Sequence, residues 1–272
     1  MTNHTKLLEN YYNKFNEDKR LNSRRGQVEF TTNLKYIEKY IPLGAKILDV
    51  GAGTGKYSLY LDKLGYDVEA VELVKQNLNV IKKKNPTLKS YLGNALDLSF
   101  LKENTYDAIL LFGPIYHLKK RSEQLKAIEE AKRLLKPNGL LFISYCMNEY
   151  AIITHGFKDG NILTSIASGK VDENFHILEK GNELYDYVRL EDINFIQEKS
   201  NLKRLKLVSS DGASSYIKDT LNKMDQSTFE VFLNYHLKTC ERQELLGAST
   251  HILDILKTDG KAFTRPWFGQ LM

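Results

Sequence analysis

The sequence has 272 residues, a length that suits one large α/β domain with an insertion, or one domain with a small lid. Its hydrophobic share of 42% and charged share of 27% lie near globular averages, which argues against disorder. The net charge of +5 permits an anionic partner without requiring one. The two cysteines, Cys146 and Cys240, lie far apart without metal-ligand spacing, so we expect a reducing compartment, no disulfide framework and no metal site.

Nothing in the sequence predicts contact with a membrane. The N-terminal stretch lacks the apolar core of a signal peptide. The longest apolar runs, such as Ile109–Phe112, are far too short to cross a bilayer. We therefore expect a cytoplasmic protein without a membrane partner.

The first 40 residues read as helical, because apolar residues such as Leu7, Leu8 and Tyr11 recur at helical spacing. From about residue 45, short apolar strands alternate with amphipathic helices, which is typical of βαβ units and a parallel sheet. The predicted strands cover residues 46–50, 67–72, 89–92, 106–112 and 140–145. The helices between them cover residues 57–64, 74–83 and 123–135, and the last helix is expected to end at a turn over residues 136–139.

The alternation breaks after Tyr145 and resumes further on. We predict a helix over residues 190–199, a strand over 203–209, a helical stretch over 213–239 and a closing strand over 250–256. Residues 41–146 and 189–258 would then form the main domain, followed by a tail over 259–272. Residues 147–188 and 213–246 are interpreted as lid or acceptor-pocket insertions, with extra helices covering the core as the alternative.

The most informative stretch is a buried strand, a glycine-rich turn and a helix start, Ile47-Leu48-Asp49-Val50-Gly51-Ala52-Gly53-Thr54-Gly55-Lys56-Tyr57. Glycines allow a tight turn and the close approach of a ligand to bare backbone, and the helix start offers free N–H groups. The spacing is G-x-G-x-G rather than G-x-G-x-x-G, which argues against a dinucleotide site, and no Walker A pattern follows.

Two further signals lie at the ends of the next strands. Glu72 ends the second strand, about twenty residues after the glycine loop, where a carboxylate can accept hydrogen bonds from ribose hydroxyls. Asn94 and Ala95 follow the third strand, where an amide oxygen and a backbone N–H suit an adenine edge. Together with the glycine loop, these residues favour an adenosine-containing ligand.

In order along the chain, ILDVGAGTGKYSLYL, VEAVEL, YLGNALDLSFL, YDAILLFGPIYHL and LLKPNGLLFISY resemble the motif series of class I S-adenosylmethionine-dependent methyltransferases. The resemblance covers roughly residues 30–145 and more loosely the C-terminal strands. It implies a Rossmann-like, seven-stranded, mostly parallel sheet with an antiparallel last strand and helices on both faces. It also implies S-adenosylmethionine as the cofactor and S-adenosylhomocysteine as its product.

The resemblance assigns roles to several positions. Asp49, Gly51, Gly53 and Gly55 would surround the methionine part of the cofactor, Glu72 would hold the ribose, and Asn94 with Ala95 would frame the adenine. Many relatives carry Asp where this chain has Asn94, which keeps the acceptor oxygen but loses the charge. The cofactor-binding set is completed by Ala52, Leu73, Phe112, Arg25 and Tyr12, with residues 1–40 covering the site.

Methyl transfer from a sulfonium is an in-line displacement, so the protein mainly aligns the acceptor and excludes water. The acceptor is expected beyond the fourth strand, near Tyr116 and His117. His117 is the candidate base, because its unperturbed pKa lies near neutrality, and Tyr116 is the candidate pocket residue. Capping or packing are the alternative roles for both. His251, beside apolar residues in the last strand, is expected to be packed.

Three functions compete at this point. The leading hypothesis is methylation of an oxygen or nitrogen atom on a small molecule, supported by the aromatic insertions. A faint similarity to an enzyme that methylates the carboxylate of a modified wobble uridine makes tRNA the second hypothesis. The basic clusters Lys82–Lys84 and Lys119–Arg121 would serve it, or are simply solvated helix faces. The third is a non-catalytic S-adenosylmethionine-binding protein, which would be expected to carry a degenerate glycine loop.

Overall fold

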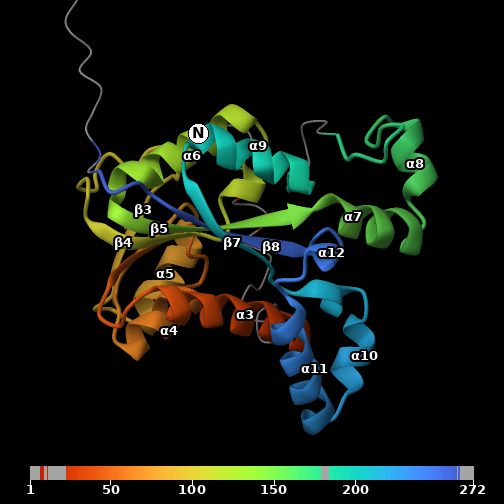
Figure 1. Ribbon diagram of the computed structural model, residues 1–272, viewed down its shortest axis with the longest axis horizontal. Coiled ribbons are helices and arrows are strands. Elements are labelled where there is room, and N and C mark those ends of the chain that lie inside the picture. Colours follow the sequence, from red (N-terminus) through yellow and green to blue (C-terminus); the bar gives the residue numbers. More distant parts are fainter. Residues whose placement is uncertain (1–6, 9–10, 12–22, 179–183, 262, 264–272) are drawn as a thin grey trace, which may run out of the picture.

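The structure, a computed structural model, describes residues 7–8, 11, 23–178, 184–261 and 263. Its centre is a twisted sheet with helices packed on both faces (Figure 1). The strands run in the order β3-β2-β1-β4-β5-β8-β7, and a short eighth strand, β6, pairs with β5. In chain order they are β1 (Lys46–Val50), β2 (Asp67–Glu72), β3 (Lys89–Leu92), β4 (Tyr106–Leu111), β5 (Leu135–Met147), β6 (Tyr187–Val188), β7 (Lys203–Ser209) and β8 (His251–Lys257).

The pairing pattern confirms the predicted fold class. The pairs β1–β2, β1–β4, β2–β3 and β4–β5 are all parallel, whereas β8 runs antiparallel to both β5 and β7. The predicted sheet lacked only the two-residue β6, which pairs Cys146 with Tyr187 and Met147 with Val188. The parallel strands end at one edge, so the loops that follow β1, β2, β3 and β4 come together there.

Helices cover the sheet on both sides. On one face, α3 (Arg24–Tyr40), α4 (Lys56–Leu64) and α5 (Lys75–Lys84) pack on a buried core that includes Ile37, Leu61 and Ile81. On the other face, α6 (Arg121–Leu134) and α9 (Leu190–Ser200) pack on a second core that includes Ile128 and Ile196. The helices repeat apolar residues at helical spacing, whereas β1 and β2 are almost continuously buried, as expected for central parallel strands.

Strand β5 departs from the prediction. It begins at Leu135, directly after α6, and the expected turn over residues 136–139 lies inside the strand. Asn138 has a left-handed φ of 61°, and the pairing with β4 shifts register between Tyr106 and Ala108. The Asn-Gly pair therefore forms an irregularity within a long strand, because the residue on its N-terminal side, Leu135, already pairs with Tyr106.

The segment after β5 carries the first group of inserted helices. They are α7 (Asn148–Ala151), a π-helical stretch (Ile152–Lys158) and α8 (Ile162–Ala167). In Figure 1 they extend away from the sheet beyond the end of β5. Several large apolar side chains remain exposed on this arm, including Leu163 at 79% and Phe157 at 57%.

The second group is a broken helical stretch rather than one helix over residues 213–239. It consists of a 3-10 turn (Gly212–Ser215), α10 (Lys218–Lys223), α11 (Gln226–Thr239) and α12 (Gln243–Leu246). The break before α11 has a physical cause, because the side chain of Asp225 accepts a hydrogen bond from Thr228 N and so caps a new helix. This group packs on α3 through Val28, Leu221 and Phe229. Among the described residues, no helix has both the length and the apolar character needed to span a bilayer.

Candidate functional site

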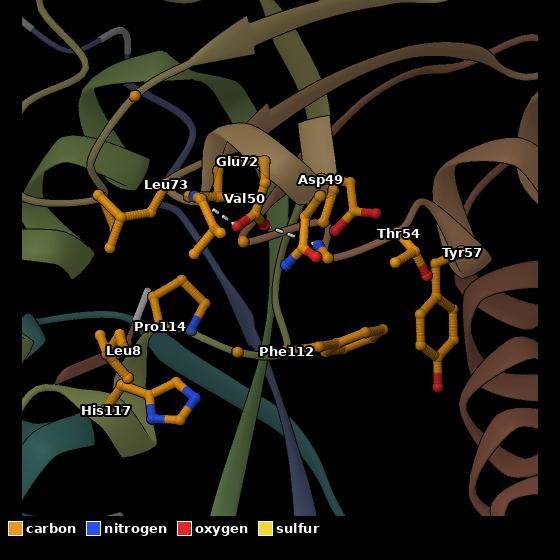
Figure 2. A pocket seen from close by; sticks show the side chains of 18 of the residues that line it. Leu8, Asp49, Val50, Thr54, Tyr57, Glu72, Leu73, Phe112, Pro114 and His117 are labelled. Carbon is orange, nitrogen blue, oxygen red and sulfur yellow. Dashed lines mark hydrogen bonds between the residues drawn. The ribbon is translucent and has the colours of Figure 1, made fainter. Parts of the chain in front are cut away.

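A cavity opens at the carboxyl edge of the sheet, where the loops after β1 to β4 meet. The glycine loop and the ends of β2 and β3 line one part of it, and the segment after β4 lines the other. In Figure 2, Asp49 and Glu72 lie across the cavity from Phe112 and His117. The cavity brings together eleven of the predicted site residues: Asp49, Gly51, Ala52, Gly53, Glu72, Leu73, Asn94, Ala95, Phe112, Tyr116 and His117.

The glycine loop needs its glycines for conformation and for space. Gly51, Gly53 and Gly55 all have left-handed φ angles, of 77°, 57° and 86°. A Cβ on Gly51 would lie 2.7 Å from Cδ of Pro114, a ring that cannot rotate away. Gly55 does not line the cavity; a Cβ there would meet Ile81 Cγ1 at 3.0 Å, so this glycine lets α4 pack closely. The loop is therefore held in one shape, with bare backbone toward the cavity.

Asp49, at the end of β1, is a buried carboxylate at the base of the loop. Its Oδ2 accepts a hydrogen bond of 2.5 Å from Ser58 Oγ on α4. Burial raises the pKa of Asp49 to about 6, although the hydrogen bonds from Ser58 oppose the shift. The group thus ionises near neutral pH, where a nearby positive charge would favour the carboxylate form.

Glu72 organises the other wall of the same loop. Its Oε2 accepts a hydrogen bond of 2.7 Å from Gly53 N, and its Oε1 accepts one of 2.8 Å from Val74 N. Burial raises the pKa of Glu72 to about 7, against the stabilising effect of these two N–H groups. The side chain of Asn77 donates a third hydrogen bond to this carboxylate, so of its roughly four lone-pair sites about one is left for a ligand hydroxyl while the group holds the loop.

Asn94 and Ala95 line the cavity after β3. The side-chain oxygen of Asn94 accepts a hydrogen bond of 3.0 Å from Leu96 N, which closes a local turn. Sequence analysis predicted this oxygen as the acceptor for an adenine amine. In the structure it already serves the turn, and only its second lone pair is available for a ligand.

The opposite end of the cavity is built around Tyr116 and His117, in the 3-10 turn Ile115–His117 after β4. His117 is buried, and its Nδ1 lies 2.8 Å from the carbonyl oxygen of Leu184. Because a carbonyl only accepts, Nδ1 carries the proton in this contact, which leaves the lone pair of the neutral ring on Nε2. The ring stacks on Tyr185 at 5.2 Å between centroids, and Tyr116 packs against both rings.

Beyond Tyr116, three polar side chains meet that sequence analysis did not connect. His251 Nδ1, at the start of β8, lies 2.9 Å from Asp211 Oδ2 and 3.8 Å from Glu29 Oε2. Glu29, on α3, also lines the cavity, and the ring of Tyr116 lies 6.3 Å from that of His251. Burial alone would lower the pKa of His251, but Glu29 and Asp211 raise it well above its ordinary value. The expectation that His251 is merely packed among apolar residues is therefore wrong.

Like Gly55, the predicted cofactor residue Arg25 stands apart from this group. Arg25 does not line the cavity; it lies at the start of α3, and its Nη1 donates a hydrogen bond of 3.4 Å to Ser215 Oγ. Tyr12 lies outside the described residues. Its neighbour Tyr11 is described, and the Tyr11 hydroxyl lies 3.3 Å from that of Tyr185, whose ring stacks on His117.

Known proteins match the central part of this chain. Residues 48–143 match the family profile described as a methyltransferase domain. A protein from Mycobacterium bovis described as an uncharacterized methyltransferase is 35% identical over 106 residues, which is 39% of this chain and 42% of that protein. A demethylmenaquinone methyltransferase from Paenarthrobacter aurescens is 36% identical over 105 residues, or 38% of this chain and 40% of that protein. The chain thus spans about two fifths of the length of these relatives.

The fold has solved counterparts over nearly the whole chain. The crystal structure of an S-adenosylmethionine-dependent methyltransferase from Thermotoga maritima superposes with a TM-score of 0.60 at 15% identity. It covers 94% of this chain and 100% of the other. At that identity the likeness establishes the fold, and the matched segment, residues 48–143, contains the glycine loop, Glu72, Asn94 and His117.

Proposed function

Because this chain carries a methyltransferase domain on the class I S-adenosylmethionine-dependent methyltransferase fold, we propose that it transfers a methyl group to an oxygen or nitrogen atom of a small-molecule acceptor. One observation carries the proposal. A single cavity is lined at one end by the glycine loop and Glu72, and at the other by Tyr116, His117 and Glu29. A group-transfer reaction requires donor and acceptor to lie side by side in one site, and a cavity with two differently lined ends would meet that requirement.

S-adenosylmethionine is the methyl donor, and the residues of the loop end fit it. The left-handed loop glycines leave backbone exposed where the methionine part would lie, and Asp49 would favour its positive charge. Glu72, which already accepts from Gly53, Val74 and Asn77, would accept a further hydrogen bond from a ribose hydroxyl. Asn94, Ala95 and Leu73 would border the adenine, and Phe112 would support the sulfonium end. When bound, the cofactor supplies an activated methyl group on a good, neutral leaving group.

At the acceptor end, the chain would position the acceptor and remove a proton from it. His117 is held in one tautomer by the Leu184 carbonyl, so its Nε2 is the basic atom of the neutral ring. A base at this place would take the proton from an acceptor hydroxyl or ammonium as the methyl group is transferred. Stacking with Tyr185 and contact with Tyr116 fix the ring and exclude water.

The surroundings favour a small acceptor over tRNA. In the basic cluster Lys119–Arg121, the guanidinium of Arg121 lies 2.6 Å from Asp186 and 3.1 Å from Asp192, so it is engaged within the protein. The glycine loop keeps its full pattern, which supports turnover over passive cofactor binding. Leu184 and Tyr185, which follow the first inserted helical group, contact His117, and on this ground the two inserted groups are proposed as a lid over the acceptor end. Both cysteines are free, which agrees with the cytoplasm as the proposed compartment.

A labelling screen tests the proposal. Purified protein is incubated with methyl-labelled S-adenosylmethionine and, separately, with a metabolite extract and with total tRNA. We expect label in a small-molecule fraction and none in tRNA. Label in tRNA alone would contradict a small-molecule acceptor and identify tRNA as the acceptor. Tight cofactor binding with no label in either pool would favour the non-catalytic alternative.

A further inference from the structure

Three potential metal ligands converge next to the acceptor end of the cavity. They are the carboxylates of Glu29 and Asp211 and the imidazole of His251, which come from α3, the turn after β7 and the start of β8. One ligand atom from each lies within 4.8 Å of the others. The residues are distant in sequence, so the fold alone brings them together.

Asp211 is fixed in place by hydrogen bonds from outside the group. Its Oδ1 accepts from Ser249 Oγ at 3.0 Å, Thr250 N at 3.1 Å and His251 N at 2.9 Å. This leaves Oδ2 as the oxygen directed at the imidazole, 2.9 Å away. Outer contacts that orient a carboxylate in this way are the usual support of a metal ligand.

The two carboxylates converge on one atom of the imidazole. Both carboxylates approach the same nitrogen, His251 Nδ1, yet one N–H can donate well to only one of them. Asp211 takes that bond, and Glu29 remains 3.8 Å from the nitrogen. A cation could accept an electron pair from all three groups at once.

Two buried hydroxyl groups stand next to the cluster in the sequence. The Oγ atom of Ser210 and the Oγ1 atom of Thr250 are buried and make no hydrogen bond within the described part of the chain. Ser210 is 0% exposed and Thr250 5%, and they directly precede Asp211 and His251 in sequence. Buried hydroxyls without partners are costly, and water or a ligand bound at such a site normally satisfies them.

We propose that Glu29, Asp211 and His251 bind a divalent transition-metal ion. One imidazole nitrogen with two carboxylate oxygens suits Mn²⁺, Fe²⁺ or Zn²⁺ better than Mg²⁺ or Ca²⁺, which prefer all-oxygen sites. Because Glu29 lines the cavity, the ion would face its acceptor end. There, in a role that rests on the proposed function, it would hold and acidify an oxygen atom of the acceptor.

Metal titration of the full chain tests the site. Protein stripped with EDTA is titrated with Mn²⁺ and with Zn²⁺ by isothermal titration calorimetry, without S-adenosylmethionine. The matched variants are His251→Gln and the milder Glu29→Gln. The control is His155→Gln, which removes an exposed histidine whose Nδ1 lies 3.2 Å from Asp159. We expect one binding event, weakened at least about 100-fold by either site variant and unchanged in the control.

The result separates this proposal from the proposed function, because metal and cofactor affinities are measured independently. Absence of a saturable binding event for either ion in the wild-type protein would overturn the metal site. So would equal weakening in the His155→Gln control, or normal affinity in both site variants when circular dichroism shows them folded. If the protein binds the metal ion but not S-adenosylmethionine, the proposed metal site stands and the proposed methyltransferase function is contradicted.

Discussion

The two ends of the cavity are built in different ways. The cofactor end comes from one continuous stretch of sequence, in which Asp49, the loop glycines and Glu72 follow each other along two strands. The acceptor end is assembled from separate segments: α3 gives Glu29, the turn after β4 gives Tyr116 and His117, and Leu184 and Tyr185 hold His117 from elsewhere.

The contrast matters for how each end recognises its ligand. At the cofactor end, backbone geometry and two carboxylates would bind the ligand. A cofactor shared by many enzymes can be bound in this way by a short, recurring sequence motif. At the acceptor end, the groups that act are mainly side chains, and His117 depends on contacts from Leu184 and Tyr185, which are distant in sequence. Substitutions should therefore act on cofactor affinity at one end and on turnover at the other.

The largest effect is expected at Gly51. Alanine there would place a Cβ 2.7 Å from Pro114 Cδ at a φ of 77°, so we expect S-adenosylmethionine affinity to fall more than about 100-fold, or about 2.7 kcal/mol. The control is Gly44→Ala, at a φ of 81° with nothing within 4 Å, which should cost only about 1 kcal/mol of stability. Calorimetric titration and thermal unfolding measure both. Equal loss of affinity in the two variants would contradict the loop assignment.

A substitution at His117 is expected to lower turnover without changing the affinity for S-adenosylmethionine. In His117→Gln, turnover of the acceptor identified by the labelling screen should fall by about 100-fold, because the basic nitrogen is lost. Cofactor affinity should stay within about two-fold, since the ring lies at the other end of the cavity. Comparison of kcat with the dissociation constant for S-adenosylmethionine checks this. Unchanged turnover would assign His117 a packing role against Tyr185.

Glu72 and Glu69 lie on the same strand and offer a matched pair. Glu72→Gln should weaken S-adenosylmethionine binding by about 20-fold, because charged hydrogen bonds contribute roughly 2 kcal/mol. Glu69 lies toward the opposite end of β2, where it bonds Lys46 Nζ at 2.6 Å and Tyr106 Oη at 2.8 Å. Glu69→Gln should therefore lower the melting temperature and leave affinity unchanged. The reverse pattern would mean that the site is misplaced.

The smallest effect is a dependence on pH. Burial raises the pKa of Glu72 from 4.5 to about 7, so between these values the native protein keeps a proton that the unfolded chain has released. Its contribution to stability therefore falls as pH rises through that window. Cofactor affinity should rise instead, by about five-fold from pH 6 to 8, since the carboxylate accepts ribose hydroxyls better. In Glu72→Gln, only the smaller change from Asp49, with a pKa of about 6, should remain.

Most of the cofactor end could be predicted from sequence, because strand, turn and helix are local. The glycine loop and Glu72 lie where βαβ reasoning puts them. The failures come from contacts between residues that are distant in sequence. Asn138 was assigned to a turn, but pairing of Leu135 with Tyr106 draws the residue into β5. Arg25 was expected at the cofactor, but it donates to Ser215.

The acceptor end was less accessible to sequence analysis. His251 sits in a largely apolar strand, so its pattern gave no sign of Asp211 and Glu29, which only the tertiary fold brings to it. The one available signal was local: Ser210-Asp211-Gly212 and Ser249-Thr250-His251 place polar residues where β7 ends and β8 begins. Because β7 and β8 are neighbouring antiparallel strands, the end of β7 lies beside the start of β8. The predicted topology was therefore enough to place these two polar segments next to each other.

The bond from Gly53 N to Glu72 Oε2 has a consequence for any dissection of the binding energy. Glu72, which would bind the ribose, also holds the glycine loop, which would bind the methionine part. The contributions of these two contacts to the binding free energy are therefore not independent. Free energies measured for separate changes at positions 53 and 72 should not sum. A double-mutant cycle across this pair would return a sizeable coupling term, because a change at either residue would release the glycine loop and the carboxylate from each other.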